Sequence, residues 1–263
     1  MRTNNTRPQR MSPAMDETRL PLVDHLSELR SRLIRIVATW FAISAAAIPF
    51  GEEIFGLMIQ PAREALDTQL ISVKPHEQFF VYLKSSLLAG FMVSLPVCFW
   101  QLWAFISPGL YQKERKAVVP FVGVSTLLFI AGSLFGYTQV FPLMFEFFAS
   151  FDNDLVRSAW SAQEVFALTT RLFIAFGASF ELPVLVFFLA MAGIVDAPTL
   201  FRGTPYATLG VFVFAAILTP PDWVSQIFLA IPMIGLYLIG VGVAYLFGGK
   251  RETEEETSSV VPR

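Results

Sequence analysis

Two glutamates in the polar parts of this 263-residue sequence, Glu28 and Glu114, stand among basic side chains. Glu28 precedes Arg30 and Arg32, and Glu114 lies in the basic run 113–116. In the simplest interpretation each carboxylate is solvated and pairs with a nearby cation, as Glu28 would with Arg32 at a spacing of four residues. In the functional interpretation, the two carboxylates receive two arginines of a ligand, because a guanidinium matches a carboxylate in bidentate geometry.

A third glutamate, Glu181, interrupts an apolar run over residues 172–194. A charged side chain within a membrane span costs roughly 2.5–3.5 kcal/mol on insertion scales, so Glu181 marks a candidate functional site. The alternative is a neutral glutamic acid that is hydrogen-bonded inside a helix bundle. A polar patch open to lipid would attract a partner helix with its own polar residue. The candidate hydrogen-bond partners of Glu181 are Thr169, Thr170, Ser179 and Gln226.

The sequence carries none of the enzyme motifs that we considered. It has no His-Glu-x-x-His, no Gly-x-Ser-x-Gly, no pair of membrane aspartates and no phosphate-binding loop. His25 and His76 have no cysteine or second histidine at metal-ligand spacing, and the only cysteine is Cys98. We therefore expect no enzymatic activity, no direct use of ATP, no metal site and no cofactor.

The composition is typical of a membrane protein. The chain is 54% hydrophobic and 15% charged, with a mean hydropathy of +0.58. Soluble domains carry roughly 25% charge. The 27 phenylalanines fit a lipid-facing surface better than a soluble core. The first 32 residues are polar and contain no apolar segment of a cleavable signal peptide.

Six apolar runs predict six transmembrane helices, because a bilayer needs about 20 apolar residues. The third run is longer than a span needs, so we expect that helix to tilt or to project beyond the bilayer. The fifth is only about 13 residues long and would span roughly 20 Å, so we expect local membrane thinning or burial against neighbouring helices. The runs cover residues 33–50, 79–103, 118–145, 172–194, 206–218 and 223–247.

The last two runs are separated by Thr219-Pro220-Pro221-Asp222, which predicts a tight hairpin because adjacent prolines cannot lie inside a continuous helix. Asp222 is also a good N-cap for the following helix. A further short helix along the membrane surface is expected over residues 54–59. The predicted fold class is therefore an all-α integral membrane protein with six transmembrane helices, the last two short and joined by this Pro-Pro hairpin.

The distribution of charge predicts the orientation. One face collects most Lys and Arg residues and holds both termini and the loop 104–116, so this face is predicted to be cytoplasmic. We expect a cytoplasmic tail over residues 1–19, a membrane domain over 20–248 and a cytoplasmic tail over 249–263. The absence of an internal repeat weakens the interpretation as an inverted-repeat transporter. The opposite face carries only Arg63, Lys74, Lys84, Arg157 and Arg171.

Five motifs in order resemble the TatC family, the polytopic receptor subunit of the twin-arginine protein translocase. The resemblance runs from about Leu20 to Phe247, and five motifs at family-like spacing are far more specific than any one of them. The motifs are His25-Leu26-x-Glu28-Leu29-Arg30, Phe105-Ile106-Ser107-Pro108-Gly109-Leu110-Tyr111-x-x-Glu114-Arg115, Phe176-Gly177-x-Ser179-Phe180-Glu181-x-Pro183, Leu218-Thr219-Pro220-Pro221-Asp222 and Ala230-Ile231-Pro232-Met233.

The resemblance implies a glove-shaped, concave bundle in the cytoplasmic membrane, which recognises folded cargo through the Arg-Arg motif of its signal peptide. It also implies work with single-span TatA- and TatB-like proteins, self-association in the complex, export driven by the proton motive force, and no nucleic-acid partner. Glu28 and Glu114 then match the acids that bind the twin arginines, and Glu181 the buried polar residue of the concave face. The other matched positions are Leu26, Arg30, Phe105 and Tyr111 in the supporting cytoplasmic motif, Pro61 in a periplasmic loop, and Asp222 and Gln226 at the last hairpin, where partner helices dock.

Two alternatives come from the residues themselves. A proton-coupled secondary transporter would use Glu181 as a buried carboxylate relay. An intramembrane protease would need a catalytic pair, which the sequence lacks.

Overall fold

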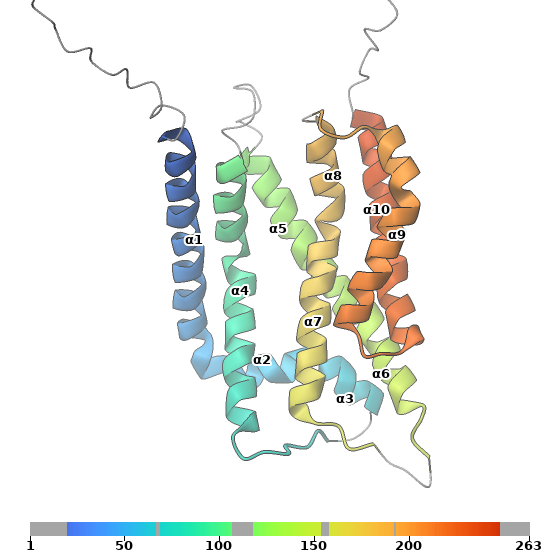
Figure 1. Cartoon of the computed structure of the whole chain (residues 1–263). Helices are drawn as coiled ribbons and strands as arrows, with labels where there is room; N and C mark the ends of the chain where they lie inside the picture. The colour runs from blue at the N-terminus through green and yellow to red at the C-terminus, as the bar shows by residue number, and fades with distance from the viewer. Residues whose placement is uncertain (1–19, 67–68, 107–117, 154–157, 192, 248–263) are drawn as a thin grey trace, which may run out of the picture.

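The structure is a computed structural model of the chain, and it describes residues 20–66, 69–106, 118–153, 158–191 and 193–247. Within these residues it has six helical spans that are long and apolar enough to cross a membrane (Figure 1), which confirms the predicted fold class. The start of the first helix and the end of the last lie at the same end of the bundle, as an even number of spans requires. Residues 1–19 and 249–263, predicted to be tails, lie outside the described residues.

The first span is longer than its apolar run. Helix α1 (Leu20–Ala47) begins 13 residues before that run. It leads through a 3-10 turn, η1 (Ile48–Phe50), into α2 (Gly51–Met58) and α3 (Gln60–Leu66). Helices α2 and α3 lie across the end of the bundle opposite the start of α1 (Figure 1). They stand where a single short surface helix was predicted.

The second span is one helix, and the third is built from three helical segments that follow one another without a loop. Helix α4 (Glu77–Ile106) contains Pro96. The third span consists of α5 (Val118–Phe135), a π-helical turn η4 (Gly136–Val140) and α6 (Phe141–Ala149), and it is 31 residues long. It runs obliquely behind the other spans in Figure 1, which confirms the predicted tilt.

The fourth span breaks at Glu181, the residue that interrupts its apolar run. Helix α7 (Ala162–Phe180) ends before Glu181, and α8 (Leu182–Met191) continues the span. The ring nitrogen of Pro183 has no hydrogen to donate and its ring crowds the preceding turn, which explains an interruption at this point.

The last two spans form the predicted hairpin and are the shortest of the six, at 22 and 24 residues against 29–34 for the others. Helix α9 (Ala197–Leu218) is joined to α10 (Trp223–Phe247) by the Pro-Pro turn. The expectation that the fifth span is too short for the bilayer is wrong. The helix begins nine residues before the apolar run and continues through Pro205, so its length of about 33 Å is enough to cross a hydrocarbon core.

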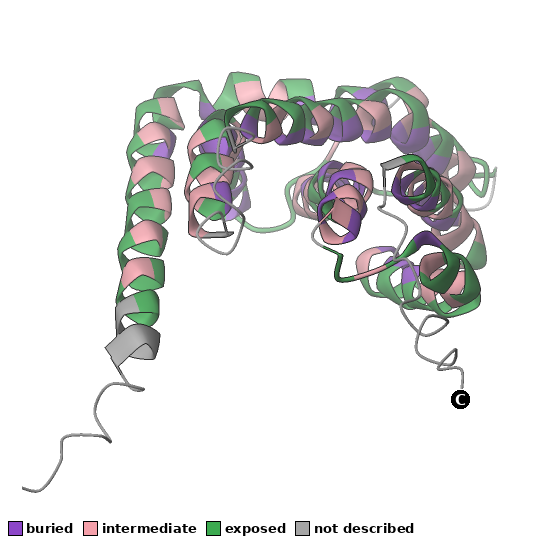
Figure 2. Cartoon of the chain, turned by 90° about the horizontal axis from the view of Figure 1, so that it is seen from above, coloured by how far each residue is buried: buried purple, intermediate pink, exposed green. Residues whose placement is uncertain are grey.

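Viewed along the bundle, the spans follow an open curve with α1 at one end (Figure 2). Helix α1 is largely exposed and packs mainly on α4. A Cβ atom at Gly90 would lie 2.1 Å from the Ser44 hydroxyl oxygen, so the absence of a side chain there allows the two helices to approach closely. The Trp40 indole adds a 2.8 Å hydrogen bond to the Leu87 carbonyl. These contacts fix α1 on α4.

A buried carboxylate joins the helices at the end opposite the start of α1. Glu77, the first residue of α4, is only 2% exposed. One of its oxygens accepts hydrogen bonds from the Ser161 hydroxyl at 2.7 Å and the Gln163 amide at 2.9 Å. The other accepts from the Val73 and Lys74 amides at 2.8 and 3.1 Å. Glu77 therefore caps α7 in place of Ser161, whose own side chain does not cap that helix.

We expect Glu77→Gln to lower the stability of the bundle by about 2–3 kcal/mol. The amide NH₂ would face two backbone or hydroxyl donors, and a buried donor without an acceptor costs about 1–3 kcal/mol. The measurement is thermal unfolding of the purified protein in detergent, with an expected fall of roughly 5 °C or more. The matched control is Glu64→Gln, because Glu64 is exposed and accepts one bond from Gln60. Equal thermal unfolding midpoints for Glu77→Gln and Glu64→Gln would contradict the idea that Glu77 stabilises the junction of α4 and α7.

Candidate functional site

Glu28 lies on α1 near its start and forms the local ion pair predicted from the sequence. Its carboxylate accepts hydrogen bonds from Nε and Nη2 of Arg32 at 3.0 and 2.6 Å. Another nitrogen of Arg32 donates to the Gln101 side chain on α4 at 3.3 Å. The Glu28 side chain is 38% exposed, and an ion pair with this exposure contributes only about 0–1 kcal/mol. The pair with Arg32 therefore contributes little to the stability of the fold.

The predicted neighbours of Glu28 lie at the same end of the bundle. Phe105, near the end of α4, stacks on His25 with ring centroids 4.4 Å apart and an interplanar angle of 18°. Leu26 is 63% exposed, and Arg30 is exposed as well. The structure therefore places an acid, a base, an apolar side chain and an aromatic pair on the ends of α1 and α4.

Glu114 and Tyr111 lie outside the described residues. The distance between the carboxylates of Glu28 and Glu114 is thus not described, and their proximity stays a prediction from the sequence.

Glu181 lies at the break between α7 and α8, and one oxygen of its carboxyl group is buried with no hydrogen-bond partner. The Ser125 hydroxyl on α5 interacts with this carboxyl group and also accepts a 3.3 Å hydrogen bond from the Trp103 indole on α4. The sequence did not suggest Ser125 or Trp103. Ser125 lies in a run without charges, and no pattern in that run shows which face meets Glu181.

None of the four partners proposed for Glu181 bonds to it. Ser179 donates to the Ala175 carbonyl at 2.6 Å, and Gln226 donates to the Phe212 carbonyl at 2.9 Å. The hydroxyls of Thr169 and Thr170 are buried without a hydrogen-bond partner. The expected set of partners is therefore wrong, because Ser179 and Gln226 bond to backbone carbonyls, and Thr169 and Thr170 precede Glu181 by 12 and 11 residues, about 16–18 Å along the helix.

The last hairpin uses its polar residues internally. Asp222 accepts a 2.7 Å hydrogen bond from the Ser225 amide, which confirms that it caps α10. Its second carboxylate oxygen is buried without a partner. Gln226 ties α10 to α9 through the Phe212 carbonyl. Pro61 is buried in α3, on the far side of the bundle from Glu28.

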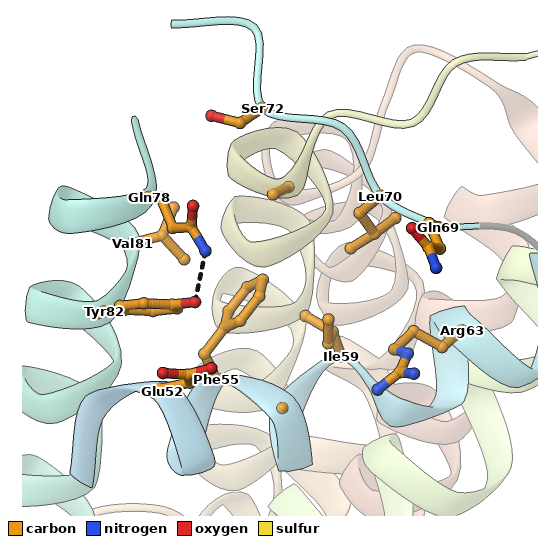
Figure 3. A pocket seen from close by; sticks show the side chains of 12 residues that line it. Glu52, Phe55, Ile59, Arg63, Gln69, Leu70, Ser72, Gln78, Val81 and Tyr82 are labelled. Atoms are coloured by element: carbon orange, nitrogen blue, oxygen red, sulfur yellow. Dashed lines mark hydrogen bonds between the residues drawn. The ribbon is translucent and has the colours of Figure 1, made fainter. Parts of the chain in front are cut away.

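An open pocket of about 320 Å³ lies at the end opposite Glu28, between α2, the start of α4 and the segment 69–72 (Figure 3). Gln78 donates to the Tyr82 hydroxyl at 2.6 Å on one wall, and Glu52 and Arg63 stand along the floor. No residue predicted for function lines this pocket, and no motif in the sequence pointed to it.

The comparisons with known proteins agree with one another. The family model described as Sec-independent protein translocase protein (TatC) matches residues 24–232. The TatC protein of Desulforapulum autotrophicum is 40% identical over 249 residues, which cover 93% of this chain and 91% of that protein. The TatC protein of Escherichia coli K12 is 37% identical over 238 residues, which cover 90% and 92%.

The fold is also similar to solved structures. A crystal structure of the twin-arginine translocase receptor TatC matches with a TM-score of 0.77 and 34% identity, covering 84% of this chain and 97% of that chain. A second crystal structure of this receptor, in DDM, matches with a TM-score of 0.78 and 33% identity.

We expect Glu181→Leu to raise the stability of the bundle by about 1–2 kcal/mol. The substitution removes a buried carboxyl oxygen without a partner, and such a group costs about 1–3 kcal/mol. Ser125 keeps the Trp103 indole as its partner. The thermal midpoint in detergent should rise by a few degrees, whereas the control Ser179→Ala should change it little. A lower midpoint for Glu181→Leu would show that the carboxyl group stabilises the fold.

Proposed function

The chain belongs to the TatC family of Sec-independent protein translocase proteins, and from this premise we propose that it is the receptor for twin-arginine signal peptides and the core subunit of a twin-arginine translocase. The observation that carries the proposal is the position of Glu28. Its carboxylate is partly exposed at the end of α1, held only by an exchangeable pair with Arg32 and flanked by the His25–Phe105 stack.

Recognition follows from exchange of guanidinium groups. One arginine of the signal peptide replaces Arg32 at Glu28, and bidentate geometry favours a guanidinium over a lysine ammonium. The second arginine binds Glu114. Arg32 retains the Gln101 side chain as a hydrogen-bond partner, so its displacement does not leave it without an acceptor. Leu26, Arg30, Phe105 and Tyr111 support the peptide around the two acids.

The chain is a multi-pass membrane protein with six spans. We place both termini in the cytoplasm of a bacterial cell, because most basic residues of the sequence lie in the terminal segments and loops that were predicted to face the cytoplasm. The receptor works without catalysing a reaction of its own, and the proton motive force drives export. Because the matched family is a family of protein translocases, we do not retain the alternatives of a proton-coupled secondary transporter and an intramembrane protease.

Single-span TatA- and TatB-like proteins are the proposed partners, together with further copies of this chain. Glu181 and the hairpin residues Asp222 and Gln226 lie on spans that such helices would contact. The unpartnered oxygens of Glu181 and Asp222 support this assignment, because a partner's polar side chain would satisfy them.

We expect Glu28→Ala and Glu114→Ala each to reduce cross-linking of a twin-arginine signal peptide up to about fivefold, since a pair with the exposure of Glu28 contributes about 0–1 kcal/mol, and the double variant to reduce it most. The measurement uses a photoreactive peptide and membranes that contain the protein at equal levels. Glu52→Ala, an exposed acid at the opposite end, should leave cross-linking unchanged. A Lys-Lys peptide should cross-link weakly to the wild type. Full cross-linking in both single variants and the double variant would overturn the two-acid recognition.

We expect Glu181→Ala to weaken association with a single-span partner more than it weakens signal-peptide cross-linking. The variant removes the polar group offered to the partner helix and leaves the Glu28 end of the bundle intact. Co-purification of a tagged partner from membranes measures the first effect, and peptide cross-linking on the same sample measures the second. Equal recovery of the partner with wild type and variant would count against docking at Glu181.

A further inference from the structure

A second open pocket, of about 600 Å³, is formed by α1, α4 and α7. Trp40, Phe91 and Ile174 contribute apolar wall, and the Trp40 and Phe91 rings meet edge to face with centroids 5.9 Å apart. The polar residues that line it include Lys84, Glu164, Thr170 and Arg171. Two cations thus share an otherwise largely apolar pocket within the membrane-spanning part of the bundle.

The hydrogen bond between Glu77 and Gln163 fixes how far each charged residue lies from the membrane surface. Glu77 accepts a hydrogen bond from the Gln163 amide, so the starts of α4 and α7 lie at one level. Lys84 follows Glu77 by seven residues and Arg171 follows Gln163 by eight, which places both about 10–12 Å along their helices. Glu164 follows Gln163 directly and lies about 10 Å closer to the membrane surface. The cations share one depth, and the acid is shallower.

The three charged side chains of this pocket and the Thr170 hydroxyl have no hydrogen-bond or ion-pair partner among the described residues. Lys84, Arg171 and Glu164 are exposed and form no ion pair or side-chain hydrogen bond with the described part of the chain. The Thr170 hydroxyl oxygen is buried and unpartnered. Side chains on a helix lean toward its N-terminus, so both cations point back toward the nearer membrane surface. A cation at this depth needs an anion beside it.

We propose that this pocket binds one phospholipid of the leaflet opposite the start of α1. Lys84, Arg171 and the Thr170 hydroxyl donate to the phosphate, and an acyl chain covers Trp40, Phe91 and Ile174. This inference goes beyond the proposed function and does not depend on it.

The order of charges favours a lipid with an amine headgroup. In such a lipid the phosphate lies next to the glycerol and the ammonium lies farther toward water. The pocket presents the complementary order, with cations deep and Glu164 shallow. A partner helix carrying one carboxylate would neutralise a cation but leave Glu164 without a partner, so the lipid accounts for more of the site.

The test is native mass spectrometry of the delipidated full chain, titrated with phosphatidylethanolamine, phosphatidylglycerol or diacylglycerol. We expect one phosphatidylethanolamine to bind at least tenfold more tightly than diacylglycerol, which has no phosphate. The double variant Lys84→Gln, Arg171→Gln should lose at least tenfold in affinity. Glu164→Gln should keep binding and lose the preference for phosphatidylethanolamine over phosphatidylglycerol.

Two control variants distinguish loss of lipid binding through lost charge from loss of binding through misfolding. Arg63→Gln removes an exposed cation at the same end of the bundle, outside this pocket, and should bind as the wild type does. The exchanged variant Lys84→Arg, Arg171→Lys should retain most of the affinity. Equal binding of diacylglycerol by the wild type, full affinity in the double glutamine variant, or equal loss in the exchanged variant would each overturn the proposal. Displacement of the lipid by a transmembrane peptide carrying a glutamate would reassign the pocket to a partner helix.

Discussion

The hydrogen bonds to Glu77 set the alignment on which the other features depend. One carboxylate, buried at the start of α4, accepts four bonds from the preceding loop and from the start of α7. A parallel bridge between Ile71 and Ser161 reinforces the same junction. Because both helices then run side by side from one level, the residues along them fall at defined depths. Lys84 comes level with Arg171, and farther along α4 the Trp103 indole reaches the Ser125 hydroxyl near Glu181.

The membrane explains why the polar residues of the spans divide into two kinds. Several serines on the helices bond to carbonyls of the preceding turn, as Ser85, Ser86 and Ser179 do, and so they cost little in lipid. Glu181, Lys84 and Arg171 have no such local partner. Glu181 is partly buried at the break between α7 and α8 and one of its carboxyl oxygens is inaccessible, whereas Lys84 and Arg171 are exposed. The exposed cations are therefore accessible to the lipid that we propose.

The sequence predicts much of this fold because bilayer thickness leaves few options for a long apolar run. The six spans, the oblique third span, the break at Glu181 and the Pro-Pro hairpin all follow from run length and proline position. The start of α9 was missed because its first residues, including Arg202 and Pro205, are tolerated near a helix end at the membrane surface. The partners of Glu181 were missed because which side of α5 faces α7 is decided by packing. The pairing of Glu28 with Arg32 was predictable because it is local, and the Glu28–Glu114 proximity remains a prediction.

The contrast between Glu28 and Glu77 shows how one residue type serves two purposes. Each of the four bonds to Glu77 joins a charged acceptor to a neutral donor inside a nearly inaccessible site, and bonds of this kind contribute about 1.5–3 kcal/mol each. Three of those donors are backbone amides, which cannot move away without a change in the backbone of the junction. Glu28 has one ionic partner at a partly exposed position, where the pair contributes about 0–1 kcal/mol. Its partner can therefore be exchanged at low cost while the backbone stays in place. Burial makes the first carboxylate structural, and exposure leaves the second available for recognition.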